Sequence, residues 1–105
     1  MKQGIVAFAF GVPSNILANV RIARTAYYKA KDLDAPVFTQ HDVDMWDGVP
    51  ITYCSEIPGN PPPTLRIARE AVQWAVQNEL RVLWIAAARP HLKRCQRDLE
   101  YAVRE

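Results

Sequence analysis

The chain has 105 residues, of which 50% are hydrophobic and 23% are charged, a balance typical of a globular domain that argues against an intrinsically disordered chain. Its formal net charge of +2 is too small to indicate nucleic-acid binding. The two cysteines have no zinc-binding spacing, and the apolar run at residues 5–10 is too short for a signal peptide or a membrane span. We therefore expect a cytoplasmic protein with no bound metal and no membrane anchor.

The first part of the chain has the pattern of a strand followed by an amphipathic helix. Residues 4–10 (GIVAFAF) form a continuous apolar run, which predicts a first strand. Residues 11–13 break this run, and Ser14 or Asn15 can cap a helix that extends to about residue 31. Residues 36–40 (PVFTQ) predict a second strand. The apolar spacing predicts a buried helix face that consists of Ile16, Val20, Ala23, Tyr27 and Ala30.

The middle of the chain contains a short connection, a strand and a second helix. Residues 41–48 (HDVDMWDG) are few for a connection between parallel strands, which usually needs a dozen residues or more. Residues 49–54 predict a third strand, and Pro50 near its start favours an edge position. A second helix begins at Thr64, which we expect to cap it, and ends near Asn78. Its predicted buried stripe is Leu65, Ala68, Val72, Ala75 and Val76.

The last part of the chain joins a strand to a third helix. Residues 82–85 (VLWI) form an unbroken apolar run, which predicts a strand buried on both faces. Three alanines follow, and Pro90 marks the turn into a helix. We expect Cys54 and Cys95 to be buried as small apolar side chains. The apolar positions of this third helix are Leu92, Cys95, Leu99, Ala102 and Val103.

The alternation of strands and helices predicts an α/β fold with a single domain over residues 1–105. We expect a three-layer α/β/α sandwich with a four-stranded, mostly parallel, Rossmann-like sheet and three helices. Right-handed crossovers predict the strand order 3-2-1-4. The direction of the third strand is the open point, because the connection that precedes it is so short.

Polar side chains follow each predicted strand, and the carboxyl ends of parallel strands share one rim of the sheet where ligands bind. His91 and Arg94 are three residues apart at the start of the third helix and point the same way. The N-terminus of that helix favours an anion, and Arg89 strengthens the preference. The alternative interpretation is that both arginines are solvated and that His91 ends a loop.

Other residues on the predicted rim have more than one interpretation each. Ser14 and Thr64 can contact a ligand or simply cap their helices, and Arg21 can reach the rim or lie on the surface. Glu56 can face the side of Arg89 and Arg94 or form a structural ion pair. His41, with the carboxylates that follow it, can act as an acid or base, can help to hold a divalent cation, or can simply be a solvated loop residue. The catalytic candidates are His41 and His91, and the ligand-binding candidates are Ser14, Arg21, Glu56, Thr64, Arg89, His91 and Arg94. No dinucleotide fingerprint, P-loop or nucleophile elbow occurs, so the sequence predicts no particular reaction.

The order of these features resembles that of the SanA/YdcF-like family of Rossmann-like α/β domains of unknown function. The chain would be a shortened and divergent member, because Thr39, Gln40 and His41 stand where the family has Ser-Gly-Gly. The resemblance implies a rim pocket for an anionic or nucleotide-like ligand, with S-adenosylmethionine suggested for some relatives. The matching positions are Arg21, Ala26, Tyr27, Tyr28, Gly48, Val49, Pro50, Glu56, Thr64, His91 and Arg94.

Two functions follow as expectations. The first is a small domain that binds an anionic small molecule at the rim, with Arg89, His91 and Arg94 on its negative group. The second is a non-catalytic interaction module, a homodimer formed either through an exposed sheet edge or around the acidic connection and Trp46.

Overall fold

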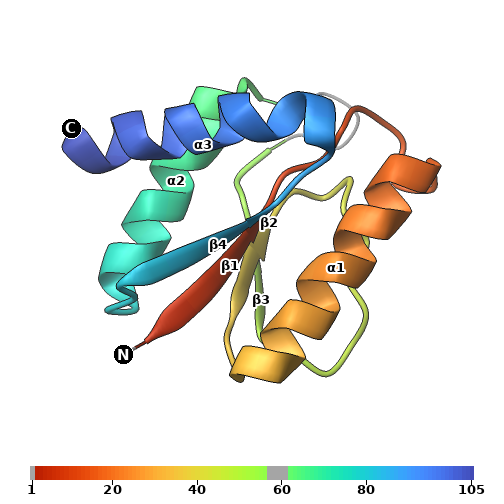
Figure 1. The fold of residues 1–105 in the computed structure, drawn as a ribbon, viewed down its shortest axis with the longest axis horizontal. Helices are drawn as coiled ribbons and strands as arrows, with labels where there is room; N and C mark the ends of the chain where they lie inside the picture. Colours follow the sequence, from red (N-terminus) through yellow and green to blue (C-terminus); the bar gives the residue numbers. More distant parts are fainter. Residues whose placement is uncertain (1, 57–61) are drawn as a thin grey trace.

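The computed structural model describes residues 2–56 and 62–105, and within them it contains four strands and three helices. The strands are β1 (Gln3–Ala7), β2 (Val37–Thr39), β3 (Ile51–Tyr53) and β4 (Val82–Ala86). The helices are α1 (Leu17–Leu33), α2 (Thr64–Gln77) and α3 (Arg89–Arg104). All strand pairs are parallel, and the order is β3-β2-β1-β4 (Figure 1). The predicted fold class and strand order are therefore confirmed.

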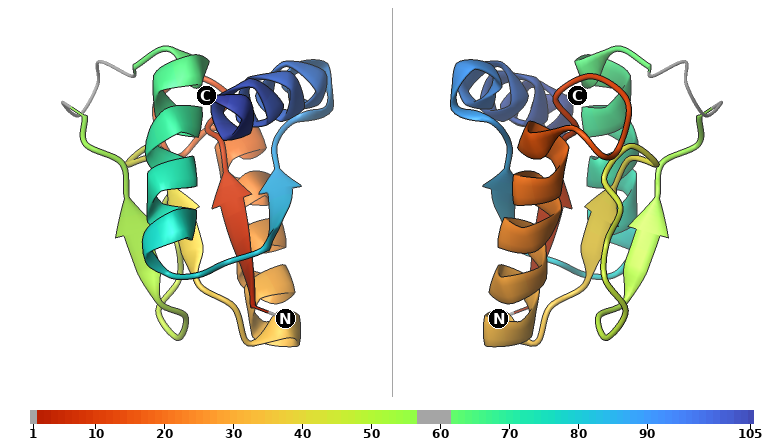
Figure 2. Two further views of the ribbon diagram at one scale, coloured as in Figure 1. Left: turned by 90° about the vertical axis from the view of Figure 1, so that its left-hand side faces the viewer. Right: turned by 90° about the vertical axis from the view of Figure 1, so that its right-hand side faces the viewer.

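The sheet separates two apolar layers, with α1 on one face and α2 and α3 on the other (Figure 2). Alternating side chains of β1 divide between them, because successive residues of a strand point to opposite faces. Ile5 and Ala7 pack with α1, whereas Val6 and Phe8 pack with α2 and α3. This arrangement follows from right-handed crossovers, since the chain moves one way across the sheet to β3 and returns past β1 to β4.

The short connection between β2 and β3 replaces a crossover helix. Its apolar side chains Val43 and Met45 are buried in the same core cluster as α1. The ring of Trp46 lies 5.0 Å from that of Tyr27, between ring centres. The connection therefore covers part of the α1 face itself, and the direction of β3, open from sequence, is parallel to β2.

The beginning of α1 differs from the prediction. Neither Ser14 nor Asn15 caps the helix, which begins at Leu17 without a side-chain cap. Asn19, which is not part of the predicted buried face, is fully buried and holds the preceding loop. Its side-chain oxygen accepts a hydrogen bond from the Phe10 N–H at 2.7 Å, and its amide donates to the Gly11 and Pro13 carbonyls. The buried residues of α1 are therefore Asn19, Ile22, Ala23, Ala26 and Ala30.

Helix α2 begins at Thr64, as predicted, and ends at Gln77 with Asn78 as its C-cap, but its buried face is rotated from the expected one. Thr64 is the first helical residue and Pro63 is the N-cap, so the capping role expected for Thr64 is wrong. Val76, placed in the buried stripe, is 72% exposed. The buried residues are Ile67, Ala68, Ala71, Trp74 and Ala75.

Strand β4 lies where the sequence predicted a strand, but it is not buried on both faces. It pairs with β1 on one side, and no strand of the described residues pairs with its other side. Trp84 is 42% exposed, donates a hydrogen bond to Gln3 Oε1 at 2.8 Å and lies under the ammonium group of Lys29. An edge strand thus has the sequence of an inner one.

Helix α3 is buried through Cys95, Leu99 and Ala102. The predicted apolar positions Leu92 and Val103 are exposed instead. Cys54 and Cys95 are free and buried, as expected. In the described part of the chain, no helix combines the length and the apolar character that crossing a membrane requires.

Candidate functional site

The carboxyl ends of the four parallel strands form one rim, at which α1, α2 and α3 begin (Figure 2). The predicted site residues lie along this rim in separate groups. Strands β3 and β4 are at opposite edges of the sheet, about 14 Å apart at normal strand spacing. Glu56, which follows β3, is therefore remote from Arg89, which follows β4.

Arg21 and Arg89 line the same cavity, a space of about 480 Å³ that we call the arginine cavity. Helix α1 contributes Arg21 and Thr25, which are four residues apart and lie on the same side of the helix. Arg89 is the first residue of α3, and three alanines precede it at the end of β4. The remaining lining residues are aliphatic: Ala18, Ile22, Ile85, Ala86, Ala87, Ala88 and Leu92.

The electrostatics of the arginine cavity favour an anion. No carboxylate lines it, and within the described ranges neither Arg21 nor Arg89 forms an ion pair. Helix α3 adds to this preference, because its first turn has no acidic residue and its N-cap, Ala88, provides no side-chain acceptor. The first turn and the N-cap of α3 therefore provide no negative charge to neutralise the positive end of the helix dipole.

His91 and Arg94 form a second group, which does not line the arginine cavity. The imidazole of His91 contacts Phe10 edge-on, with the ring centres 6.3 Å apart. The guanidinium of Arg94 turns to Asp98, one helical turn later, with 4.0 Å between Nε and the carboxylate. His91 and Arg94, which were expected to point the same way, therefore do not join Arg21 and Arg89 in one site.

Burial lowers the pKa of His91 below its usual value of 6.5, and the charge of Arg94 lowers it further against the opposing effect of Asp98. The unfolded chain then binds a proton before the folded protein does, so we expect the free energy of unfolding to fall as the pH drops below about 6.5. Urea denaturation between about pH 7.5 and about pH 5.5 measures this dependence. A His91→Gln variant should show a shallower dependence, and an equal slope in both proteins would contradict the assignment.

Glu56 and His41 form a third group at the ends of β2 and β3. The carboxylate of Glu56 accepts a hydrogen bond from the backbone N–H of His41 through Oε1. Its other oxygen, Oε2, is buried without a hydrogen-bond partner among the described residues. The imidazole of His41 stacks on Tyr53, with the ring centres 4.7 Å apart.

The charge of Glu56 affects its two ionisable neighbours. Burial raises the pKa of Cys54 to about 12, and Glu56 contributes to that shift. Burial and Glu56 also raise the pKa of Asp42. Cys54 is therefore a neutral, unreactive thiol at neutral pH. No group of three or more potential ligands in residues 2–56 and 62–105 is arranged to hold a metal ion.

The two remaining predicted residues, Ser14 and Thr64, lie apart from the arginine cavity. Ser14 lines a small space of about 170 Å³ with Asp44 and Trp46, on the α1 face. Thr64 is the first residue of α2. Sequence reasoning missed Thr25, although its spacing of four residues from Arg21 is the signal that places both on one helix face.

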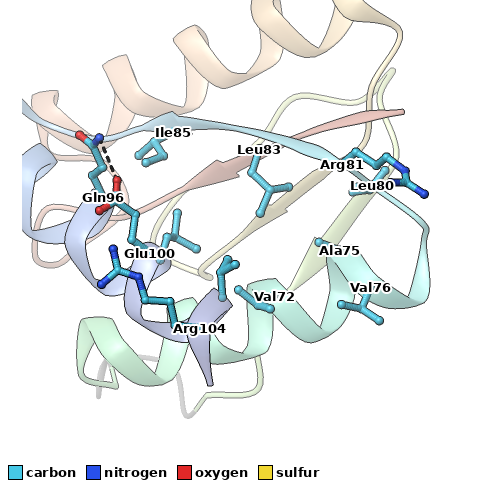
Figure 3. Close-up of a pocket in the computed structure, with 12 residues that line it drawn as sticks. Val72, Ala75, Val76, Leu80, Arg81, Leu83, Ile85, Gln96, Glu100 and Arg104 are labelled. Carbon is cyan, nitrogen blue, oxygen red and sulfur yellow. Dashed lines mark hydrogen bonds between the residues drawn. The ribbon is translucent and has the colours of Figure 1, made fainter. Parts of the chain in front are cut away.

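A second surface lies beside β4, on the α2 and α3 face, and we call it the outer groove (Figure 3). Its volume is about 590 Å³, and its walls come from α2, β4 and α3. Leu83 and Ile85 of β4 and Val72 and Val76 of α2 provide apolar surface. On the α3 side Gln96 donates a hydrogen bond to Glu100 at 3.3 Å, with Arg104 nearby (Figure 3).

Fold and site together define a small parallel α/β protein with an arginine-lined cavity at the end of β4. No protein-family model, curated protein or solved structure matches the chain. The resemblance to the SanA/YdcF-like family stays a prediction.

Proposed function

We propose that this protein binds a small anionic molecule in the arginine cavity, at the carboxyl end of β4. The observation that carries the proposal is that two arginines from distant parts of the chain, Arg21 and Arg89, line one cavity whose lining includes no acidic residue. Its volume, about 480 Å³, is in the range of small-molecule sites. Buried free cysteines suit a reducing compartment, so the proposal includes the cytoplasm as its location.

Arginine substitutions test the proposal. The first experiment is a thermal-shift screen of nucleotides, sugar phosphates, S-adenosylmethionine and short carboxylates. A ligand is identified by a rise in the melting temperature, because a molecule that binds only the folded state stabilises it. We expect Arg21→Ala and Arg89→Ala each to weaken its binding at least about tenfold in calorimetry, since a hydrogen bond to a charged group contributes about 1.5–3 kcal/mol.

The matched control is Arg24→Ala, which removes the same charge from α1 outside the cavity lining. The dissociation constant of this variant should lie within about twofold of the wild-type value, because the charge of an exposed side chain outside the cavity is screened by salt. An equal loss in all three variants would indicate a nonspecific charge effect and would contradict the proposed site. A screen in which no anion raises the melting temperature would also contradict it.

A second candidate function, the homodimer, is favoured by the position of β4. Its outer side has no strand partner in the described residues, and its side chains are apolar toward both faces. Antiparallel pairing with β4 of a second copy would satisfy the free backbone groups of both strands. Such a two-fold interface would also bring the two outer grooves together.

Sedimentation equilibrium tests the homodimer. We expect a mass of two chains for the wild type and of one chain for Trp84→Lys, because the substitution places like charges opposite each other at the centre of the paired strands. The control is Tyr28→Lys, in the aromatic cluster of Tyr27, Tyr28 and Trp46, in which Tyr28 and Trp46 are exposed. Dissociation by Tyr28→Lys alone would assign the interface to that cluster, and a monomeric wild type would contradict both.

A further inference from the structure

We infer that the ligand of the arginine cavity is a short-chain aliphatic carboxylate. This inference rests on the proposed function, which specifies an anionic ligand but not the chemistry of the rest of the molecule. It also distinguishes the cavity from the nucleotide-binding pocket that the family resemblance implies.

The composition of the lining carries the first step. Only three of its ten side chains can form hydrogen bonds, those of Arg21, Thr25 and Arg89. The other seven side chains are aliphatic, so most of the side chains in the wall can contact only the apolar part of a ligand. A ligand that matches this wall has one anionic group and an apolar body.

The lining lacks the groups that nucleotide sites commonly use. Dinucleotide sites of the Rossmann type bind the ribose hydroxyls through a carboxylate. Nucleobases are commonly stacked on aromatic side chains. The arginine cavity has no acidic, amide or aromatic side chain in its lining. A nucleotide would place its most polar and most aromatic groups against alanine, isoleucine and leucine.

The third step concerns how the cavity accommodates an apolar chain. Residues 86–88 at the end of β4 and Ala18 on α1 are all alanines, and their small side chains leave room in the cavity. Arg21 and Arg89 provide planar donors that bind a carboxylate through two parallel hydrogen bonds. The carboxylate is therefore assigned to the arginines, and the chain to the space beside Ala18, Ile22 and Leu92.

Calorimetry with butanoate, hexanoate and octanoate tests the inference on the intact chain. We expect each added methylene to tighten binding by about fourfold until the cavity is filled, because a buried methylene contributes a fixed increment. Arg21→Ala should weaken all three ligands by a similar factor. Ala18→Leu, which fills the space for the chain, should weaken octanoate more than butanoate, and circular dichroism checks that this variant folds.

Adenosine monophosphate is the competing ligand. If it binds more tightly than hexanoate and loses affinity in Arg21→Ala, the inference is overturned while the proposed function stands. Dissociation constants that do not change with chain length also overturn the inference. If none of the four compounds binds the wild type, and the screen above finds no other anion, both the inference and the proposed function are wrong. The chain-length series decides the question even if Ala18→Leu does not fold.

Discussion

Trp74→Ala is expected to reduce the free energy of unfolding by about 3–5 kcal/mol, the largest effect of any substitution considered for this protein. Trp74 is 6% exposed, and its ring lies 5.5 Å from that of Phe38, between centres. A Cβ at Gly4 would lie 2.9 Å from the Trp74 ring, so the indole packs directly on the backbone of β1. Truncation would leave a cavity over the centre of the sheet.

The matched control is Val76→Ala, two residues later on the same helix. Val76 is 72% exposed, so its truncation should change the free energy of unfolding by no more than about 0.5 kcal/mol. Urea denaturation followed by circular dichroism measures both variants without depending on the lost fluorophore. Equal losses in the two variants would contradict the burial of the α2 face described above.

Asn19→Ala is expected to have the second largest effect, because it should reduce the free energy of unfolding by about 2 kcal/mol. The side chain is fully buried and joins the loop after β1 to the first turn of α1 through three hydrogen bonds. Its removal breaks all three partly buried hydrogen bonds, each of which contributes about 0.5–1.5 kcal/mol to stability.

Asn15→Ala is the control for Asn19, because Asn15 is exposed just before α1 and no side-chain cap holds that helix. The free energy of unfolding of Asn15→Ala, measured by chemical denaturation, should lie within about 0.5 kcal/mol of the wild-type value. If Asn15→Ala instead destabilises the protein as much as Asn19→Ala, the capping role predicted from sequence would be correct and the structural assignment wrong.

The topology could be predicted because it depends on coarse features. Alternating apolar runs and amphipathic segments indicate parallel α/β architecture, and the handedness of crossovers restricts the strand order. The apolar run at residues 82–85 did not predict the exposure of β4, because an inner strand and this edge strand have the same apolar pattern, although the predicted strand order itself places β4 at an edge. The prediction that Val76 is buried was wrong for a related reason, since an apolar residue can face the outer groove as well as the core.

The candidate site was predicted in part. Arg21 and Arg89 were both named, but sequence spacing joined Arg89 to His91 and Arg94 on its own helix. The partner that lines the same cavity lies on another element, and only the three-dimensional structure brings α1 next to the end of β4. One of the two interpretations of Glu56 placed it facing Arg89 and Arg94, although the predicted strand order itself puts β3 and β4 at opposite edges of the sheet.

The most direct test of whether an aliphatic carboxylate binds between Arg21 and Arg89 is a titration of the ¹⁵N-labelled protein with hexanoate followed by NMR. We expect saturable chemical-shift changes in residues 18–25 and 85–92, which include the lining of the arginine cavity, and at least about tenfold weaker binding in Arg21→Ala. Shifts centred on residues 41–56 or on the outer groove, or no saturable shifts at all, would contradict binding of the carboxylate in this cavity.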